Sequence, residues 1–409
     1  RTMLAKKHGD AQQTRFMPPR SHKRTFSPFA QALPVAPSLG AAVSAHAAGE
    51  LPEIYGSMIY NNKWNNQTEV KAGLYRIPAE DGGVFELKME GPVADFGGVA
   101  KDGVYYATRR VQYQQDVWNI VEGFDLETGE KEYSDMPESN TVLAAGLDVD
   151  PVTGNIYGIC YKENLQGYTL NTLEYSKFDG VHSTVVASLE GDWSGFAIDS
   201  KGNFYGLQTS WYTSSGYDFA EKTVLCKIDR ETGVHTEIGN TGYAAQYTSG
   251  MTFDRKTDRL FYYVTPNYGK PKMTELDTKT GVATVIAEFN NEEQMAGLFV
   301  PGATAPAKAP AEPTDISFSF PGTSLDGEVT LKAPATLFDG SQATGNVTVH
   351  VELNGFEKAV KSGSYGQQMT IPVHMGTSGL YDFVVYASND EGNGPKVKVR
   401  GVYVGADTP

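Results

Sequence analysis

The chain has 409 residues and a net charge of −15, with 40% apolar and 20% charged residues. This length exceeds one ordinary domain, so we expect two or three folded domains. The acidic balance excludes a nucleic-acid-binding protein, because phosphate contacts need a clustered basic surface, and the lack of any run of about 18 apolar residues excludes a membrane-spanning helix.

Residues 1–50 differ in composition from everything after them. The first 30 contain seven Lys or Arg against Asp10 alone, a net charge of +6 that leaves −21 for the rest, and a stretch rich in Ala, Pro and Ser follows. We expect an arm that is ordered only where it lies on another surface, such as the acidic body of the protein. The chain begins at Arg1 rather than Met, and a removed secretory signal is one candidate for a preceding piece.

Regular repeats occupy residues 51–301. The clearest copy is WSGFAIDSKGNFYGL at 193–207, which predicts a hairpin of two short strands around a Ser-Lys-Gly-Asn turn. A period of about 50 residues that holds about four strands predicts a β-propeller, in which each repeat is one blade. The small-Gly-apolar start of the repeat recurs, at intervals of 48, 49, 55 and 47 residues, at Gly98, Gly146, Gly195, Gly250 and Gly297.

A second recurring element marks tight turns within the blades. It reads FDLETG at 124–129, IDRETG at 228–233 and LDTKTG at 276–281. Asp in this position bonds back to the backbone, and Gly accepts a positive φ. The element therefore predicts the hairpin that joins the third and fourth strands of a blade.

The number of copies predicts a five-bladed β-propeller. Four complete blades fill residues 93–290, approximately. The segment before them has three predicted strands, 53–60, 73–77 and 84–89, but no inner strand, whereas 294–300 is an inner strand with nothing after it. Joining the two ends completes a fifth blade and removes the exposed edges of an open stack. A six-bladed ring is the alternative, should part of the arm supply a blade.

A Pro/Ala-rich linker at 302–313 leads to a second domain at 314–405. The segment YDFVVYASN at 381–389 resembles the sixth strand of a fibronectin type III domain, with Tyr381 at the tyrosine corner. Leu331 stands where that family has Trp, so a generic immunoglobulin-like β-sandwich stays open. The predicted strands of the sandwich are 315–320, 328–332, 347–353, 369–374, 381–387 and 397–404.

A β-propeller followed by such a sandwich resembles secreted multidomain bacterial surface proteins. The resemblance is one of architecture, and it carries no catalytic motif. It implies an extracellular or cell-surface location.

Propeller geometry predicts which face of the ring carries function. If strands a to d of each blade run antiparallel outward from the axis, the a–b and c–d turns share one face, and the b–c and d–a connections share the other. The a–b and c–d turns are short, whereas the b–c connections are long and rich in aromatic and amide residues, which suit a glycan or peptide ligand. The predicted ligand-binding residues are Trp64, Asn65, Tyr113, Trp118, Tyr168, Trp193, Trp211, Tyr212, Tyr217 and Tyr268. The competing interpretation is that these aromatic residues wedge the blades together.

We therefore expect a non-catalytic extracellular binding or adhesion protein that presents this face to a glycan, peptide or protein ligand, without a cofactor. The alternative is a carbohydrate-active, glycosidase-like enzyme. Its carboxyls would be Asp95 and Asp192, each three residues before a repeat glycine, with Glu293 as a further candidate; the simpler interpretation is that these acids are solvated at the pore mouth. A protein-interaction scaffold is a third possibility.

No metal site is predicted, because the Asp148 and Asp150 pair lacks the glycine and distal Glu spacing of a calcium loop. The two cysteines, Cys160 and Cys226, lie in different repeats and are expected to be buried free thiols.

Overall fold

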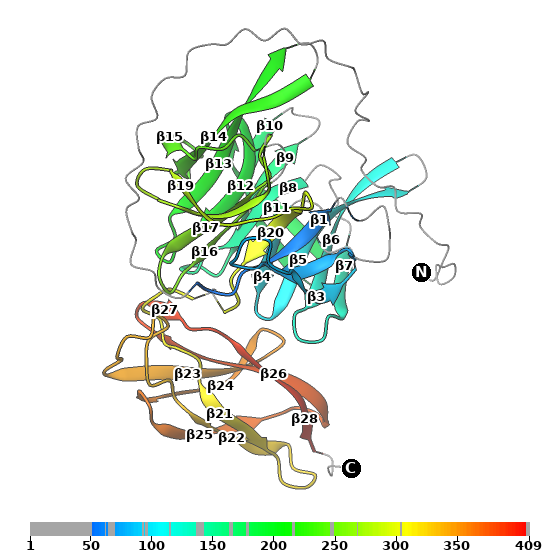
Figure 1. Cartoon of the computed structure of the whole chain (residues 1–409). Helices are drawn as coiled ribbons and strands as arrows, with labels where there is room; N and C mark the ends of the chain where they lie inside the picture. The colour runs from blue at the N-terminus through cyan, green and yellow to red at the C-terminus, as the bar shows by residue number, and fades with distance from the viewer. Residues whose placement is uncertain are drawn as a thin grey trace.

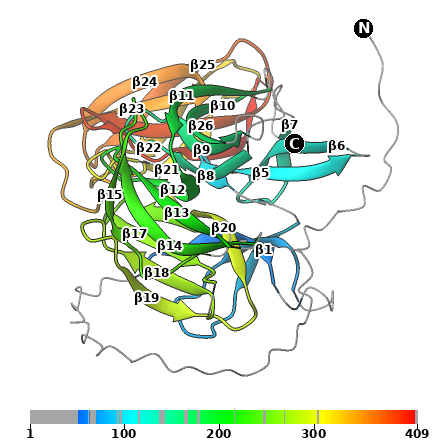
Figure 2. The same ribbon diagram turned by 90° about the horizontal axis from the view of Figure 1, so that it is seen from above.

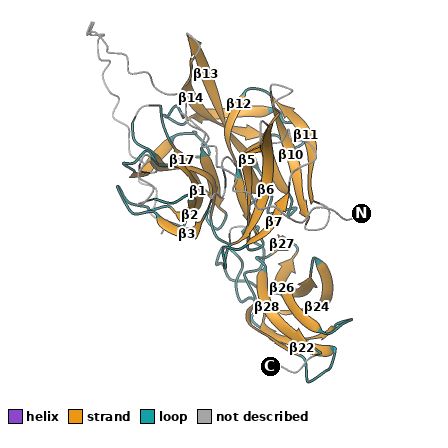
Figure 3. Cartoon of the chain, turned by 90° about the vertical axis from the view of Figure 1, so that its right-hand side faces the viewer, coloured by secondary structure: helices purple, strands orange, loops and turns teal. Residues whose placement is uncertain are grey.

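The computed structural model describes residues 51–405, apart from 62, 64–69, 92–93, 95–96, 114–115, 136–142, 163–166, 177–179, 215–216, 246–248, 268 and 303–304. The predicted arm at 1–50 lies outside the described residues. In the part that is described, the regular structure consists of β-strands, as Figure 3 shows in orange.

Strands between residues 55 and 299 form five four-stranded antiparallel sheets. The first sheet contains β20 (Gln294–Phe299), β1 (Tyr55–Tyr60), β2 (Gly73–Arg76) and β3 (Glu86–Glu90). The second contains β4 (Gly98–Lys101), β5 (Val104–Tyr113), β6 (Asp116–Asp125) and β7 (Lys131–Asp135). The third contains β8 (Leu143–Val149), β9 (Ile156–Lys162), β10 (Gly167–Ser176) and β11 (Gly180–Leu189).

The remaining two sheets follow the same order. The fourth contains β12 (Asp192–Ile198), β13 (Phe204–Ser214), β14 (Tyr217–Ile228) and β15 (His235–Asn240). The fifth contains β16 (Gly250–Asp254), β17 (Arg259–Val264), β18 (Lys272–Leu276) and β19 (Ala283–Glu288). In Figure 2 these sheets follow one another around the body in chain order, from cyan β5 to yellow-green β19.

The inner strands of the five sheets close into a ring. Strands β4, β8, β12, β16 and β20 contact one another in that order, and β20 contacts β4. A closed ring of antiparallel sheets, each contributing its first strand to the centre, is a β-propeller. The predicted joining of the chain ends is confirmed, because β1 pairs antiparallel with β20, with Tyr55 opposite Phe299.

The repeat glycines allow neighbouring inner strands to approach closely. At Gly146 of β8, a Cβ atom would lie 2.7 Å from the backbone nitrogen of Phe196 on β12. A side chain there would force the third and fourth sheets apart. This close approach explains why the sequence period is marked by glycine.

Aromatic pairs fill the spaces between neighbouring sheets. One stacked pair, Tyr106 and Tyr175, has ring centroids 4.5 Å apart with an interplanar angle of 7° and joins the second and third sheets. Such aromatic pairs stabilise the folded state beyond the contribution of their buried apolar area. Further aromatic pairs between neighbouring blades, among the described residues, are Tyr105 and Phe299, Tyr157 and Phe204, Tyr205 and Phe253, and Phe85 and Phe289. Both cysteines are buried, and neither forms a disulfide, as predicted.

The predicted Asp turns are present between the third and fourth strands of three sheets. The Asp125 carboxylate accepts bonds from the backbone N–H groups of Glu127 and Thr128, at 3.0 and 2.9 Å. Asp229 and Asp277 make the matching bonds in their own turns. The following glycines all have a positive φ, as the sequence element predicts.

Two of the b–c connections differ from the prediction of long loops. Strands β5 and β6 pair as far as Tyr113 and Asp116, and β13 and β14 pair as far as Ser214 and Tyr217. The β13–β14 hairpin projects beyond the body of the propeller (Figure 1). The aromatic residues that suggested a ligand loop also have high strand propensity, so the ladder continues outward.

Residues 314–404 form a separate two-layered β unit, called here the C-terminal unit. One sheet contains β21 (Thr314–Ser319), β22 (Asp326–Lys332) and β25 (Gln368–His374). The other contains β24 (Phe356–Ser364), β23 (Asn346–Leu353), β26 (Gly379–Asn389), β27 (Gly392–Asn393) and β28 (Val397–Val404). A single apolar core that includes Leu331, Val349 and Phe383 lies between the sheets.

The predicted tyrosine corner lies in this unit, and the predicted linker leads into it. The Tyr381 hydroxyl donates to the Thr377 carbonyl at 3.2 Å, four residues upstream, as a tyrosine corner would. In the segment expected to be an extended linker, Ala305 and Ala309 are fully buried beside Phe338. The connection is therefore packed onto the unit that follows it.

The C-terminal unit lies against the a–b and c–d turns of the propeller. The Lys256 ammonium of the β16–β17 turn is 5.3 Å from the ring centre of Phe338. A cleft of about 330 Å³ between the two parts is lined by Lys101 and Asp102 on one side and by Asn393 and Lys396 on the other. Because the unit occupies the turn face, the b–c and d–a connections lie on the opposite face (Figure 1).

Candidate functional site

An open pocket of about 550 Å³ lies on the b–c and d–a face, between the third and fourth sheets. The end of β9 and the start of β10 form one side of it, and the connection from β11 to β12 forms the other. Its lining consists of Tyr161, Gly167, Leu189, Glu190, Gly191 and Asp192. The pocket therefore combines an aromatic ring with two exposed carboxyl side chains, those of Glu190 and Asp192.

Two predicted residues, Tyr168 and Asp192, lie close together at this pocket. The rings of Tyr168 and the lining residue Tyr161 are 5.3 Å apart, tilted by 55°. Burial, and to a smaller extent the negative charge of Asp192, raises the pKa of Tyr168 to about 12. The Tyr168 hydroxyl thus stays protonated and able to donate a hydrogen bond at neutral pH.

The connection from β11 to β12 is held in place by two hydrogen bonds to one of its carbonyl groups. The Glu190 carbonyl accepts bonds from the Trp193 indole and from the Gln208 side-chain amide, each at 3.1 Å. The same Gln208 amide nitrogen is 3.2 Å from Nε2 of His235. These bonds fix the backbone of the pocket wall to β13 and β15.

Gly191 permits this arrangement through its conformation and its small size. Its φ is +86°, and a Cβ atom would lie 2.3 Å from Nε2 of Gln208. Gly191→Ala is expected to lower the free energy of unfolding by about 1–2 kcal/mol from the left-handed backbone alone, and to displace Gln208 from Glu190. Urea denaturation measures the first effect. The matched control is Gly242→Ala, at φ +87° with no atom within 4 Å; an equal loss in both variants would mean that the Gln208 contact contributes nothing.

Trp193, the other predicted residue beside the pocket, belongs to the core. Its side chain is 3% exposed and packs with Phe196 and Phe204. Its ring meets the His235 ring edge-on, at 5.1 Å. This placement matches the competing interpretation, in which aromatic residues wedge the sheets together.

The other predicted ligand-binding residues fall into two groups. Trp64, Asn65 and Tyr268 lie outside the described residues. Tyr113, Trp118, Trp211, Tyr212 and Tyr217 lie in strands of the two extended hairpins rather than in loops.

The three candidate catalytic acids have different surroundings. Asp192 is exposed at the pocket, and Asp95 lies outside the described residues. Glu293 is 3% exposed, and its carboxylate accepts bonds from the backbone and side-chain nitrogens of Asn291, at 2.8 and 2.9 Å. Glu293 therefore caps the turn before β20.

Glu190 and Tyr161 are pocket residues that sequence reasoning did not select. Glu190 could have been found from its position, because it lies in a d–a connection, on the face that geometry already predicted to carry function. No comparable signal marks Tyr161, since it looks like any other tyrosine of a b strand.

The described residues contain no cluster of three His, Cys, Asp or Glu side chains placed to hold a metal ion. They also contain no helix with the length and apolarity needed to cross a membrane.

No protein-family model and no curated protein matches the sequence. Among solved structures, the chain is similar to TolB from Acinetobacter baumannii, at 12% identity and a TM-score of 0.36, over 70% of this chain and 62% of that one. It is also similar to a GH32 β-fructofuranosidase from Bombyx mori, at 10% identity and a TM-score of 0.34, over 86% and 89% of the two chains. A periplasmic gluconolactonase from Pseudomonas aeruginosa has 9% identity and a TM-score of 0.32, over 78% and 99%. The assignment of a β-propeller rests on the sheet topology and the closed ring of inner strands.

Proposed function

We propose that the propeller binds a carbohydrate in the pocket lined by Tyr161 and Asp192, beside Tyr168. The observation that carries the proposal is the meeting of one tyrosine ring, that of Tyr161, and two carboxyl side chains in one open pocket on the b–c and d–a face, with the Tyr168 ring next to that of Tyr161. A sugar ring offers an apolar face to an aromatic side chain, and its hydroxyls bond to carboxylates and to the tyrosine hydroxyl. Peptide or protein ligands are the alternative occupants of the same face.

Binding to a glycan array, followed by titration calorimetry on a glycan that it identifies, tests this proposal. Tyr161→Ala and Asp192→Asn are each expected to weaken binding by about tenfold, from a lost aromatic contact and from lost bonds to a charged acceptor. Trp64 and Trp211 are also predicted ligand contacts, and the variants Trp64→Ala and Trp211→Ala are tested for glycan binding in the same way.

The matched controls change the same residue types elsewhere. Tyr403→Ala removes an exposed tyrosine of the C-terminal unit, and Glu231→Gln neutralises an acid of a c–d turn on the opposite face. Both should bind as the unchanged protein does. If Tyr161→Ala and Asp192→Asn also bind normally, the pocket is not the binding site.

A carbohydrate-active enzyme is the second candidate, because Glu190 and Asp192 line the same pocket. Glycosidases commonly use two carboxyl groups, one as general acid and the other as base or nucleophile. Glu190→Gln and Asp192→Asn would then each reduce hydrolysis of a bound glycan by about 100-fold or more. Hydrolysis that survives both changes together excludes this pair, and binding without hydrolysis favours the non-catalytic function.

We further propose that the five described sheets are the complete set of blades and that the C-terminal unit is a fibronectin type III or immunoglobulin-like sandwich. Its three- and five-stranded sheets and the Tyr381 contact support the second assignment. An extracellular or cell-surface location is part of the same proposal, in which the C-terminal unit holds the propeller with its pocket facing outward.

A further inference from the structure

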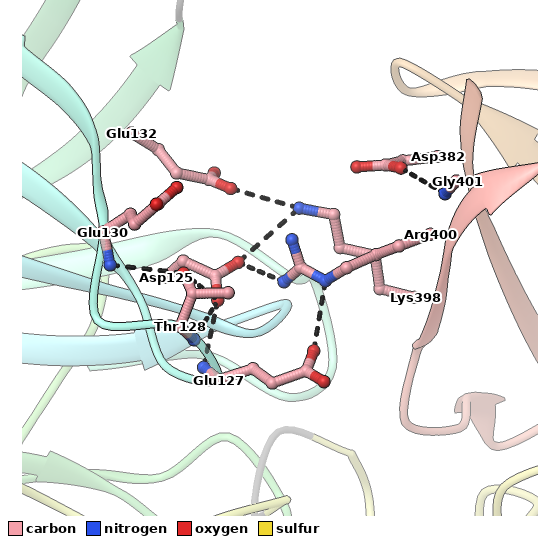
Figure 4. Close-up of polar contacts among 9 residues, drawn as sticks. All are labelled: Asp125, Glu127, Thr128, Glu130, Glu132, Asp382, Lys398, Arg400 and Gly401. Atoms are coloured by element: carbon pink, nitrogen blue, oxygen red, sulfur yellow. Dashed lines mark hydrogen bonds and ion pairs between the residues drawn. The ribbon is translucent and has the colours of Figure 1, made fainter. Parts of the chain in front are cut away.

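The contact between the propeller and the C-terminal unit is built from opposite charges. On the C-terminal unit, Lys396, Lys398 and Arg400 alternate along the chain into β28, so that their side chains share one side of the strand. This group is called here the basic edge. Opposite it, the second sheet presents the acidic patch, which consists of Asp102, Asp125, Glu127 and Glu132. Figure 4 shows Lys398 and Arg400 against Asp125, Glu127 and Glu132.

Each basic side chain reaches the acidic patch. The Lys398 ammonium is 3.2 Å from a Glu132 carboxylate oxygen and 3.7 Å from one of Asp125. Arg400 bonds to Asp125, and its Nε is 3.1 Å from a Glu127 carboxylate oxygen. Lys396 is 3.9 Å from Asp102 and 3.2 Å from Glu352 of its own unit.

Asp125 is the centre of the contact and is almost completely buried, with 2% of its side chain exposed. Burial acts to raise its pKa, but the bonds from Arg400, Thr128 and Glu127 outweigh that effect and hold the pKa well below its usual range. The carboxylate therefore remains ionised within the contact. A buried carboxylate that lost its cation would be strongly destabilised.

The two other Asp turns of the same type provide an internal comparison. Among the described residues, the carboxylates of Asp229 and Asp277 accept bonds within their own turns. Asp125 makes the same turn bonds and, in addition, binds Lys398 and Arg400. The turn alone does not require those cations, so their placement reflects docking between the units.

We propose that the acidic patch is the docking surface for the basic edge, and that these ion pairs fix the C-terminal unit on the turn face of the propeller, leaving the b–c and d–a face free. The partner that fits the patch is a strand with basic residues at alternate positions. This inference does not depend on what the pocket on the opposite face binds.

The test compares the whole chain with the variant Lys398→Glu/Arg400→Glu. Reversal of both charges should separate the units, which increases the radius of gyration in small-angle X-ray scattering. Protease cleavage between residues 301 and 313 should become about tenfold faster, because local opening exposes the connection. Addition of about 0.5 M NaCl to the unchanged protein should shift both measurements in the same direction, because salt screens the pairs that remain in contact with solvent.

Two matched variants separate docking from other effects. Lys332→Glu/Lys358→Glu makes the same change in net charge at exposed positions away from the acidic patch and should leave both measurements unchanged. Asp125→Asn keeps the turn acceptor but removes the charge, and it should open the units, whereas Asp229→Asn should not.

Three results would overturn the proposal. One is a compact, cleavage-resistant Lys398→Glu/Arg400→Glu variant. Another is an equal response from the Lys332→Glu/Lys358→Glu control. If the charge-reversed protein does not fold, as judged by near-UV circular dichroism, Asp125→Asn decides instead, and behaviour identical to that of Asp229→Asn refutes docking through this contact.

Discussion

Arg255→Ala is expected to lower the free energy of unfolding by about 3–5 kcal/mol, the cost of breaking a buried ion pair by removing one partner. The Arg255 guanidinium is 4% exposed and lies 2.7 Å from the Asp148 carboxylate. It also donates to the Val149 carbonyl at 2.7 Å and to the Ile198 carbonyl at 3.1 Å. One side chain from the fifth sheet therefore holds the inner strands of the third and fourth.

The loss should be large because Arg255 is the one cation that pairs with Asp148 among the described residues. Burial raises the pKa of Asp148, and the charge of Arg255 opposes that shift. Without the arginine, the carboxylate keeps only its bonds from the Ile198 and Val149 N–H groups. Urea denaturation followed by far-UV circular dichroism measures the change.

Arg259→Ala is the matched control for this prediction. Arg259 pairs with Glu275 at 2.7 Å within the fifth sheet, and their side chains are 22% and 20% exposed. Its removal should cost about 1 kcal/mol, as for pairs with access to water. If Arg255→Ala costs no more than Arg259→Ala, the buried pair does not tie the three sheets together.

Tyr105→Ala is expected to lower the free energy of unfolding by about 3–5 kcal/mol, as for other large aromatic residues removed from a core. Tyr105 of β5 is fully buried, and its hydroxyl donates to the Gly297 carbonyl of β20 at 2.8 Å. Its ring lies 5.3 Å from that of Phe299. Gly98 leaves room for the hydroxyl, since a Cβ there would lie 2.1 Å from it. The substitution leaves a cavity between the second sheet and β20, where the ring closes.

Two further variants show how much of the stability loss in Tyr105→Ala comes from packing and how much from the hydrogen bond. Tyr105→Phe keeps the packing and leaves the Gly297 carbonyl without its donor, which should cost about 1–3 kcal/mol. Tyr403→Ala, at a residue that is 41% exposed, should stay within about 0.5 kcal/mol. Thermal unfolding of the three variants gives the order, and a Tyr105→Ala protein as stable as Tyr403→Ala would contradict the role of this residue in closing the ring.

Much of the fold could be predicted from the sequence, because the signals that indicate it are local and recur in each repeat. The glycine at each inner strand, the Asp turns and the unmatched strands at the two ends predicted the four-stranded sheets and the pairing of β1 with β20. The same local signals misled at the b–c connections. Aromatic, Ser and Thr residues around Trp211 suit both a ligand loop and a strand, and cross-strand pairing decided for the strand.

The candidate site was only partly predictable. Tyr168 was selected from the face on which it lies, and Asp192 from its position three residues before a repeat glycine. Glu190 and Tyr161 became visible only once β9 and the β11–β12 connection were placed side by side. Trp193 shows the limit most clearly, because the position of a residue along a strand does not tell whether its ring faces a pocket or the space between two sheets.

By itself the sequence determined the repeat, the closure of the ring and the chemistry of its turns, since these depend on periodicity and on hydrogen bonds between residues a few positions apart. Only the tertiary structure decided which Asp turn is occupied by a partner and where a pocket opens. Asp125 and Arg400 are 275 positions apart in the chain, and a contact of that kind is set by how folded units pack, for which no local pattern exists.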